Sequence, residues 1–262
     1  MSISSSSLNQ LSKTERTERN RKLYDGWAPV YDIDGNALPL VDDVIFNERV
    51  VPLMQAQSAD RAIRVLDIGC GTGRNTAKLP ALLSQGFAGD SAIYAVDVSE
   101  GMMKEAKRKL EGGLVEVNVR LLDFHTQAEE LAQFVGDPVD IVISTLVLGH
   151  VELDAFFATV GRHLKRDGWA WVTTMHPSIG EITGAGYRRA NGLKVGGVTV
   201  NYETDEIVDA AKKSGLEVEG DIVEAGVGSD EAEAVANYGE RARKWAGYKI
   251  FSGIRFIKSA IL

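Results

Sequence analysis

The chain has only one cysteine among its 262 residues, so no disulfide can form within it. It lacks any run of 18 apolar residues, which a membrane-spanning helix needs, and its serine-rich start differs from a secretory signal. Basic residues are not in excess either: the formal net charge is −8, which opposes binding to nucleic-acid phosphates. We therefore expect a cytoplasmic protein with no nucleic-acid partner and no membrane partner, present as a monomer or a homodimer.

The length and the 44% share of hydrophobic residues suffice for the core of one domain with appended segments. We expect residues 1–20 to form a disordered tail, although the charged stretch from Lys13 to Lys22 also fits a solvated helix. Residues 21–60 are predicted to form a helical lid, and residues 61–262 the main domain. Within that domain, a segment at about 177–203, rich in glycine and basic residues, is predicted to be an insertion.

A glycine-rich turn between Val65 and Asn75 is the most informative motif of the chain. An apolar stretch ends there in glycines at positions 69, 71 and 73, and a predicted helix begins directly afterwards. Glycine has no Cβ, so it reaches positive φ and lets a ligand lie against the backbone, where the free N–H groups of a helix start can meet it. The turn therefore predicts a nucleotide-binding cradle.

The spacing of this turn discriminates among nucleotide ligands. A dinucleotide fingerprint needs a glycine three positions after the second one, where this chain has Arg74. A phosphate loop needs Lys and Ser or Thr after its last glycine, and they are absent as well. Asp67 would repel a pyrophosphate and suits a cationic amino group. The motif thus favours an adenosine ligand with little or no phosphate.

The turn resembles the first motif of the class I S-adenosylmethionine-dependent methyltransferases, and the likeness continues along the chain. Asp97 ends the next apolar stretch, and Asp123 with Phe124 ends the third. In the family, the first acid holds the two ribose hydroxyls, and the second accepts from the adenine amino group beside a packing side chain. The stretch from Val139 to Val151 resembles the fourth strand and exit loop of the small-molecule branch.

Apolar stretches and amphipathic helices alternate through residues 61–176, which indicates a parallel sheet with both faces covered. With the resemblance, this implies a Rossmann-like three-layer α/β sandwich with a seven-stranded, mostly parallel sheet. Residues 216–219 are expected to begin strand six and residues 248–257 to form an antiparallel strand seven. Pro80 lies inside an apolar helical pattern, so that helix should kink or restart there. Residues 230–244 are predicted to form one charged helix.

The resemblance implies S-adenosyl-L-methionine as the cofactor, S-adenosyl-L-homocysteine as the product, and no metal. The residues expected to hold the cofactor come from the aromatic segment before the first strand, the glycine turn and the ends of the next three strands. They are Tyr31, Asp67, Gly69, Cys70, Gly71, Thr72, Gly73, Asn75, Asp97, Val98, Met102, Asp123, Phe124, Ser144, Thr145 and Leu146. Cys70 lies between two cradle glycines and is interpreted as a small side chain rather than as a thiol nucleophile.

Methyl transfer from a sulfonium needs mainly orientation in a dry pocket, with a base only if the acceptor must lose a proton. His150 follows the fourth strand and His176 the fifth, at the edge of the sheet where open α/β folds bind ligands. Each is a candidate for a catalytic base or for positioning the acceptor, with a structural role as the alternative. His163 is interpreted as a surface residue on the polar side of its helix.

Aromatic residues before the first strand suggest a lid that meets the positive sulfur by cation–π contact and excludes water, although they also fit a plain core. Tyr24 and Trp27 are assigned to the substrate side, with Tyr31 nearer to the cofactor. Arg188 in the insertion is a candidate for holding an anionic acceptor, with a solvated loop as the alternative. In the family that the chain resembles, enzymes that methylate adenine or glutamine carry Asn/Asp-Pro-Pro-Tyr after the fourth strand. This chain lacks that motif there, so the resemblance disfavours DNA bases and protein glutamine as acceptors.

Together these features predict a methyltransferase of the EC 2.1.1 type. It would move the sulfonium methyl by in-line displacement to an N, O or S atom of a small molecule, such as a secondary metabolite. The alternative from another class is a non-methylating S-adenosylmethionine-binding protein, either a regulator or a fold relative with another reaction. A protein or RNA methyltransferase is disfavoured by the acidic charge.

Overall fold

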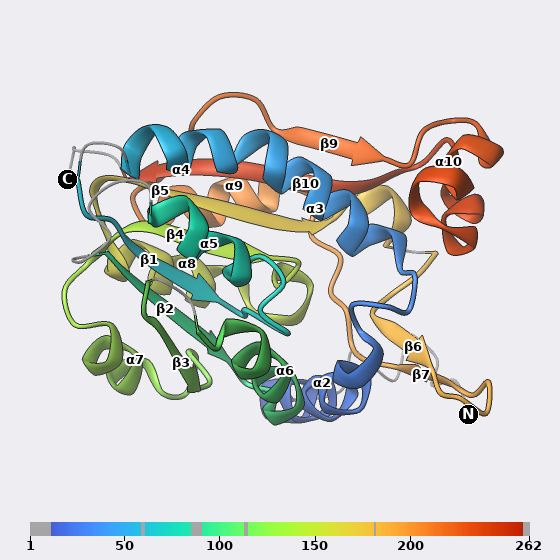
Figure 1. Cartoon of the computed structure of the whole chain (residues 1–262), viewed down its shortest axis with the longest axis horizontal. Helices are drawn as coiled ribbons and strands as arrows, with labels where there is room; N and C mark the ends of the chain where they lie inside the picture. The colour runs from blue at the N-terminus through green and yellow to red at the C-terminus, as the bar shows by residue number, and fades with distance from the viewer. Residues whose placement is uncertain (1–11, 59–60, 85–90, 113–114, 181, 259–262) are drawn as a thin grey trace.

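A mixed β-sheet runs through the centre of the molecule, and helices cover both of its faces (Figure 1). The computed structural model describes residues 12–58, 61–84, 91–112, 115–180 and 182–258. Within these ranges the sheet has eight strands, in the order β3-β2-β1-β4-β5-β10-β8, with β9 paired to β10. The strands are β1 (Arg64–Ile68), β2 (Ala92–Asp97), β3 (Val117–Leu121), β4 (Val139–Thr145), β5 (Leu164–Met175), β8 (Leu216–Val218), β9 (Val223–Gly226) and β10 (Lys249–Lys258).

The first five strands are parallel, whereas β10 runs antiparallel to β5, β8 and β9. The predicted Rossmann-like α/β sandwich with an antiparallel seventh strand is therefore confirmed. The sequence does not predict β9, nor the separate hairpin of β6 (Gly186–Arg188) and β7 (Lys194–Gly196). Strands this short, containing glycine and charged residues, leave no apolar periodicity to detect.

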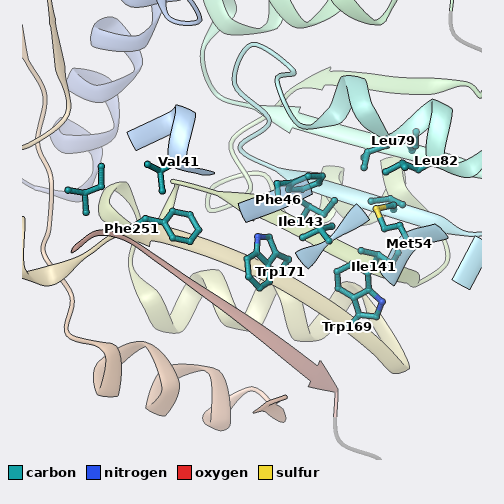
Figure 2. Packing of buried hydrophobic residues seen from close by; sticks show 14 of the residues in the cluster. Val41, Phe46, Met54, Leu79, Leu82, Ile141, Ile143, Trp169, Trp171 and Phe251 are labelled. Atoms are coloured by element: carbon teal, nitrogen blue, oxygen red, sulfur yellow. The ribbon is translucent and has the colours of Figure 1, made fainter. Parts of the chain in front are cut away.

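Burial on both faces explains why the central strands read as continuous apolar runs. In β4, Ile141 and Ile143 pack into one hydrophobic cluster and Val142 into the other. The first cluster lies under α3 (Ala37–Arg49), α4 (Val51–Ser58) and α5 (Leu79–Leu83). Figure 2 shows Phe46 of α3 and Met54 of α4 packed beside Ile143. Phe46 is completely buried, and removing such a side chain from water contributes about 1.5–3 kcal/mol.

The second cluster lies under α7 (Ala128–Val135), α8 (Leu153–His163) and α9 (Thr204–Lys213). None of the helices in the described ranges is long and apolar enough to cross a membrane. The remaining helical elements are α2 (Lys13–Trp27), α6 (Glu100–Leu110), α10 (Glu231–Tyr238) and the 3-10 helices η1 (Ala28–Val30), η2 (Thr76–Lys78), η4 (Leu148–His150), η5 (Pro177–Ile179) and η6 (Glu240–Trp245).

Helix α2 contradicts the predicted disordered tail from Lys13 to residue 20 and agrees with the alternative of a helix over Lys13 to Lys22. Residues 1–11 lie outside the described residues, but the chain is helical from Lys13 onward. Ser12 and Glu15 form a capping box, in which each side chain accepts from the backbone N–H of the other. Leu23 and Trp27 are buried near the far end of the helix. The apolar content that anchors α2 therefore begins only after residue 20, which is why its first turns resemble a tail in sequence.

Two further helix predictions have different outcomes. The predicted interruption at Pro80 is confirmed, because η2 ends at Lys78 and α5 begins at Leu79 with the proline in its first turn. The single helix predicted over residues 230–244 is wrong, because the chain forms α10 and η6 instead. Gly239 separates them with a φ of +85°, a conformation that ends a helix.

The interpretation of His163 as a surface residue is also wrong. Its side chain is 4% exposed, and Nδ1 lies 2.9 Å from the carbonyl oxygen of Thr159. His163 follows Val160 by three residues, so it lies beside the apolar stripe of α8 rather than opposite to it. Burial lowers the pKa of His163, which favours the neutral imidazole in this position.

Candidate functional site

The glycine turn after β1 has the geometry of a ligand cradle. Gly69, Gly71 and Gly73 all have positive φ, of +74°, +56° and +74°. The N–H of Gly69 donates to the carbonyl of Val96 at 2.8 Å, which ties the turn to the end of β2. A Cβ at Gly69 would clash with Val147, whereas no atom of the described residues lies within 4 Å of a Cβ placed at Gly71. The backbone of Gly71 therefore borders open space that a ligand can enter.

Asp97 at the end of β2 faces this space, and two backbone groups hold its carboxylate. Oδ2 accepts from the N–H of Gly71 at 2.9 Å, and Oδ1 accepts from the N–H of Ser99 at 2.8 Å. Burial raises the pKa of Asp97, while the two N–H donors act to lower it. Each carboxylate oxygen retains a second lone pair, so Asp97 can still accept from two hydroxyl groups of a ligand.

A cavity lies over the turn, and we call it the cradle cavity. Among the predicted site residues it is lined by Tyr24, Tyr31, Gly69, Gly71, Asp97, Val98, Met102, Asp123, Phe124, Thr145, Leu146 and His150. Sequence reasoning missed its other lining residues, which are Thr17, Asn20, Val96, Leu122, His125, Val147 and Val151. Five of these directly adjoin predicted residues at the strand ends, whereas Thr17 and Asn20 come from the segment that was expected to be a tail.

The loop after β3 supplies an acid and two rings to the cradle cavity. Oδ1 of Asp123 accepts from the backbone N–H of His125 at 2.9 Å, which fixes the carboxylate at the cavity wall. The rings of Phe124 and His125 lie 4.3 Å apart between centroids. Burial lowers the pKa of His125 and so favours its neutral form. The loop thus offers one hydrogen-bond acceptor beside flat surfaces, which suits a planar base with an amino group.

Asp67, Cys70 and Ser144 are predicted cofactor residues that do not line the cradle cavity. Asp67 is 2% exposed and accepts from the Thr76 hydroxyl at 2.6 Å, and burial raises its pKa to about 7. Cys70 is buried in an apolar cluster, which raises the pKa of its thiol. Ser144 donates to the carbonyl of Ile68 at 2.8 Å. The geometry therefore does not support a direct pairing of Asp67 with an amino group of the ligand.

Thr72, Gly73 and Asn75 also lie outside the lining of the cavity, and they hold the turn in place. The Thr72 hydroxyl donates to Asp32 at 2.8 Å, and the Asn75 amide donates to Asp42 at 2.9 Å. Gly73 packs against α6, where a Cβ would be only 3.3 Å from the nearest side chain. These residues connect the cradle to the N-terminal segment and to α6.

Arg74, the residue that excludes a dinucleotide fingerprint, contacts two carboxylates of α3. Its guanidinium lies 2.5 Å from Asp42 and 2.7 Å from Asp43, and its side chain is 15% exposed. Asp42 also accepts from the Thr173 hydroxyl at 2.9 Å. The positive charge of Arg74 is thus used to hold α3 against the turn.

Helix α2 is fastened to the cradle at Asp25. Its Oδ1 accepts from the Ser99 hydroxyl at 2.7 Å and from the backbone N–H of Gly101 at 3.0 Å. A carboxylate at this position also complements the positive end of α6. A Cβ at Gly101 would lie 2.7 Å from the backbone oxygen of Asp25, so glycine is required for this close approach. Asp25 thus ties the segment predicted as a lid to the start of α6.

A second space, which we call the aromatic cavity, lies beside the cradle cavity. Tyr24 stacks on Trp27 with ring centroids 5.7 Å apart, and Trp27 stacks on Tyr187 at 5.8 Å. The ring of Tyr31 meets Trp27 edge-on at 4.9 Å. The cavity is lined by Tyr24, Trp27, Tyr31, Asn36, Ala37, Leu38, Pro39, Leu146, Gly149, His150, Thr174, Met175, Ile179, Thr183, Gly184, Ala185, Gly186, Thr199, Val200, Arg241, Lys244, Trp245 and Ile250.

The two cavities share a wall made of Tyr24, Tyr31, Leu146 and His150. Leu146 adopts a φ of +62°, which is rare for a residue with a side chain, and its N–H donates to the carbonyl of Thr173 at 3.0 Å. Such backbone strain is held by the surrounding structure and clusters at functional sites. The shared wall is therefore the place where two bound molecules would meet.

A hydrogen-bond network fixes the imidazole of His150 in this wall. Nδ1 lies 3.1 Å from the carbonyl oxygen of Val198 and Nε2 lies 2.7 Å from the Tyr24 hydroxyl. The Asn20 side chain pairs with both backbone groups of Val198, at 2.9 and 2.7 Å. Nδ2 of Asn20 also lies 3.2 Å from Nδ1, but it donates at the shorter distance of 2.9 Å to the Val198 carbonyl. Because that carbonyl can only accept, we assign the proton to Nδ1, and the lone pair of Nε2 then accepts from the Tyr24 O–H. Burial lowers the pKa of His150 and favours this neutral form.

His176 and Arg188, two other predicted site residues, line neither cavity. His176 does follow β5 at the expected edge, but Nε2 lies 3.0 Å from Glu224 of β9, and Nδ1 caps η5 through Ser178. The geometry therefore gives His176 a structural place rather than a catalytic one. The Arg188 guanidinium donates to the carbonyl of Gly192 within the β6–β7 hairpin.

The arrangement joins two binding spaces through one proton-accepting group. The cradle cavity offers carboxylates and glycine backbone, and the aromatic cavity offers ring faces. Among the described residues, no group of three or more His, Cys, Asp or Glu side chains is arranged to hold a metal ion. The chemistry available at the wall is thus proton transfer and the orientation of two neighbouring molecules.

Sequence comparison finds related proteins along most of the chain. Residues 65–168 match the family model described as a methyltransferase domain. AN0656 of Emericella nidulans, an uncharacterized methyltransferase, is 30% identical over 260 residues, which cover 88% of each protein. A ubiquinone biosynthesis O-methyltransferase of Mesorhizobium japonicum is 32% identical over 118 residues, or 45% of this chain and 43% of that protein.

Solved structures share the fold at lower sequence identity. The complex of DhpI with SAH has a TM-score of 0.60 and 17% identity, and the match covers 94% of this chain and 98% of that one. An S-adenosylmethionine dependent methyltransferase from Mesorhizobium loti has a TM-score of 0.53 and 18% identity, with 79% and 96% covered. These likenesses establish the fold.

Proposed function

Because this chain belongs to the class I S-adenosylmethionine-dependent methyltransferases, we propose that it methylates a small molecule held in the aromatic cavity. One observation carries this proposal: the cradle cavity and the aromatic cavity share Tyr24, Tyr31, Leu146 and His150. A donor in the first space and an acceptor in the second would meet at that wall. Direct transfer between two bound molecules needs this adjacency.

The residues of the cradle cavity fit S-adenosylmethionine. Asp97 retains acceptor capacity for the two ribose hydroxyls, and Asp123 has an oxygen for the adenine amino group beside the ring of Phe124. Gly71 leaves open space against its backbone. Tyr31 brings an aromatic ring to the shared wall, and aromatic rings attract cations. When bound, the cofactor supplies a methyl group that its positive sulfur has already activated.

In our proposal Tyr24 and His150 accept the proton that the acceptor loses. Nε2 of His150 holds the Tyr24 hydroxyl proton in a hydrogen bond, so the lone pairs of the Tyr24 oxygen are free to accept from an O–H or N–H of the acceptor. As the acceptor atom forms its bond to carbon, its proton moves to the Tyr24 oxygen, and the Tyr24 proton moves to Nε2. The resulting imidazolium keeps its Nδ1–H bond to Val198. The carbon–sulfur electron pair stays on sulfur, so charge and atoms balance.

The lid contributes to the same reaction by excluding water. Trp27 is 2% exposed, and its Nε1–H donates to Asp34 at 2.9 Å, which fixes the ring over the aromatic cavity. Burial raises the pKa of Tyr31 to about 12, so its hydroxyl stays protonated. A dry, rigid wall strengthens the electrostatic contacts inside it and keeps water from competing as an acceptor.

The proposal is tested by following a labelled methyl group. The protein is incubated with methyl-labelled S-adenosylmethionine and, separately, with small-molecule, protein and RNA fractions of the host organism. We expect label in the small-molecule fraction, with one S-adenosylhomocysteine formed for each methyl transferred. Label confined to protein or RNA would contradict a small-molecule acceptor. Tight cofactor binding by calorimetry without any S-adenosylhomocysteine would instead favour a binding protein.

A further inference from the structure

Positive charge gathers at one side of the aromatic cavity, although the chain as a whole is acidic. Arg241 and Lys244 of η6 both line the cavity, and neither of them lines the cradle cavity. Among the described residues, the lining contains no Asp or Glu, although the protein as a whole has 37 acidic residues and 29 Lys and Arg residues. This side of the aromatic cavity is therefore positively charged, in contrast to the protein as a whole.

The β6–β7 hairpin adds two more cations to the same region. Arg188 and Lys194 are direct partners across the hairpin, so their side chains lie on one face of it. Burial lowers the pKa of Lys244, and the charges of Arg241, Lys194 and Arg188 lower it further. The hairpin also supplies Ala185 and Gly186, at its start, to the cavity lining. The positive charges of η6, β6 and β7 are thus close enough to repel one another around Lys244.

These cations are only partly neutralised within the protein. Nη1 of Arg241 lies 2.9 Å from Asp34. In the part of the chain that the structure describes, Lys244, Lys194 and Arg188 have no carboxylate partner within 4.0 Å. Arg243, also in η6, differs: it pairs with Glu240 at 2.7 Å and with Glu231 at 3.4 Å. Like charges without counterions repel one another, and an anion placed among them relieves that repulsion.

We propose that the acceptor is an organic anion, with a carboxylate or phosphate group held near Lys244 and an apolar body in the aromatic cavity. Leu38, Ile179 and Ile250 give the cavity its apolar lining. The ring of Trp245, 4.3 Å from the Lys244 ammonium, forms the boundary between the apolar and the charged parts. The inference rests on the proposed function, since it names the acceptor class of the same site.

The charge preference is measured by binding, without turnover. Equilibrium dialysis compares 2-naphthoate with its uncharged counterpart 2-naphthamide, in the presence of saturating S-adenosylhomocysteine. We expect the wild type to bind the carboxylate at least about tenfold more tightly, with the advantage shrinking as salt is raised. The Lys244→Gln variant should lose this preference, and Lys194→Gln should reduce it. Arg243→Gln is the matched control, because its charge is already paired, and it should keep the preference.

Methylation provides the second readout. Among acceptors found by labelling, acids should be methylated and their amides or esters should not, and Lys244→Gln should raise KM about tenfold with kcat nearly unchanged. Equal binding of the two naphthyl probes by the wild type, absence of binding included, would overturn the inference. So would a Lys244→Gln variant that keeps the preference. Methylation of uncharged acceptors alone would overturn the anion inference and leave the proposed function standing. Selective binding of naphthoate without methylation of any acceptor would overturn the proposed function and leave the anion site standing.

Discussion

The hydroxyl of Tyr24 lies 2.7 Å from Nε2 of His150 and so joins helix α2 to the loop after β4. The two residues are 126 positions apart in the chain, and both belong to the wall between the two cavities. The pair places a neutral base where a donor and an acceptor would meet. It also makes α2 part of the site, because Tyr24 lines both cavities from that helix.

Removing either member of this pair should slow the chemical step. We expect His150→Gln to lower kcat about 100-fold, the lower end of what a general base contributes, and Tyr24→Phe to lower it by a smaller factor. The double variant should be no slower than His150→Gln, because the two groups act as one unit. Steady-state kinetics with the acceptor found by labelling measures these effects.

The pH profile gives this prediction a signature that a structural role would not produce. Burial lowers the pKa of His150 below 6.5, so the wild-type kcat should stay constant above pH 6.5 and fall as acid protonates the imidazole. His150→Gln should lack this acid limb. His176→Gln is the control, because His176 lines neither cavity, and its profile should match the wild type. An acid limb that persists in His150→Gln would contradict the assignment.

Asp97→Ala should weaken cofactor binding strongly. Hydrogen bonds to a charged group contribute about 1.5–3 kcal/mol each, so losing two should reduce the affinity for S-adenosylhomocysteine at least about 100-fold. Titration calorimetry measures the change. Asp67→Asn is the control, because Asp67 is also an aspartate of this region but lies beneath the turn, outside the cavity lining. An unchanged affinity in Asp97→Ala would refute the ribose assignment.

Asp67 should make stability depend on pH in the direction opposite to that of most acids. Burial raises its folded-state pKa from 3.8 to about 7, so the folded protein keeps a proton that the unfolded chain has lost. The contribution of Asp67 to stability therefore falls as pH rises from about 4 to about 7 and is constant above. We measure the free energy of unfolding in urea for Asp67→Asn and for the wild type. As pH rises across that range, the value of the variant should increase relative to that of the wild type by up to ~4 kcal/mol. A difference that does not change with pH would exclude a raised pKa.

The Leu146→Gly variant of the protein should be more stable than the Leu146→Ala variant. The φ of +62° at Leu146 costs a residue with a Cβ about 1–2 kcal/mol, and glycine avoids that cost. We expect Leu146→Gly to melt at least about 2 °C above Leu146→Ala in thermal scans. Val147, the next residue, has a φ of −97° and serves as the control: there the alanine variant should be the more stable one. If the alanine variant is also the more stable one at position 146, Leu146 is not strained.

The strand ends were predictable because local pattern determines them. Asp97 and Asp123 follow runs of apolar residues, and parallel strands bring their carboxyl ends to one edge of the sheet. Five of the missed cavity residues are immediate neighbours of predicted ones, so a strand-end position was the signal that could have found them. The sequence predicts where each strand ends, but not which of the neighbouring side chains at that end faces the cavity.

The remaining parts of the site depend on contacts between distant segments. Asn20 binds the backbone of Val198, 178 residues away, and no local pattern predicts that pairing. His176 follows β5 at the predicted ligand-binding edge of the sheet, but the unpredicted strand β9 brings Glu224 to its ring. Asp67 has the right charge, yet its side chain turns to Thr76 beneath the turn. In each case a tertiary partner decides the orientation, and sequence spacing does not contain it.

The shared wall also divides the chain into segments that can diverge separately. Except for residues of α2 and Tyr31, the cradle cavity takes its lining from residues 69–151. Most of the aromatic cavity comes from residues 24–39 and 174–250. With the acceptor in the aromatic cavity, as we propose, substitutions in those flanking segments would change which molecule is methylated without touching the glycine turn, Asp97 or Asp123. Proteins built on this plan can therefore exchange one acceptor for another during evolution while inheriting an unaltered donor site.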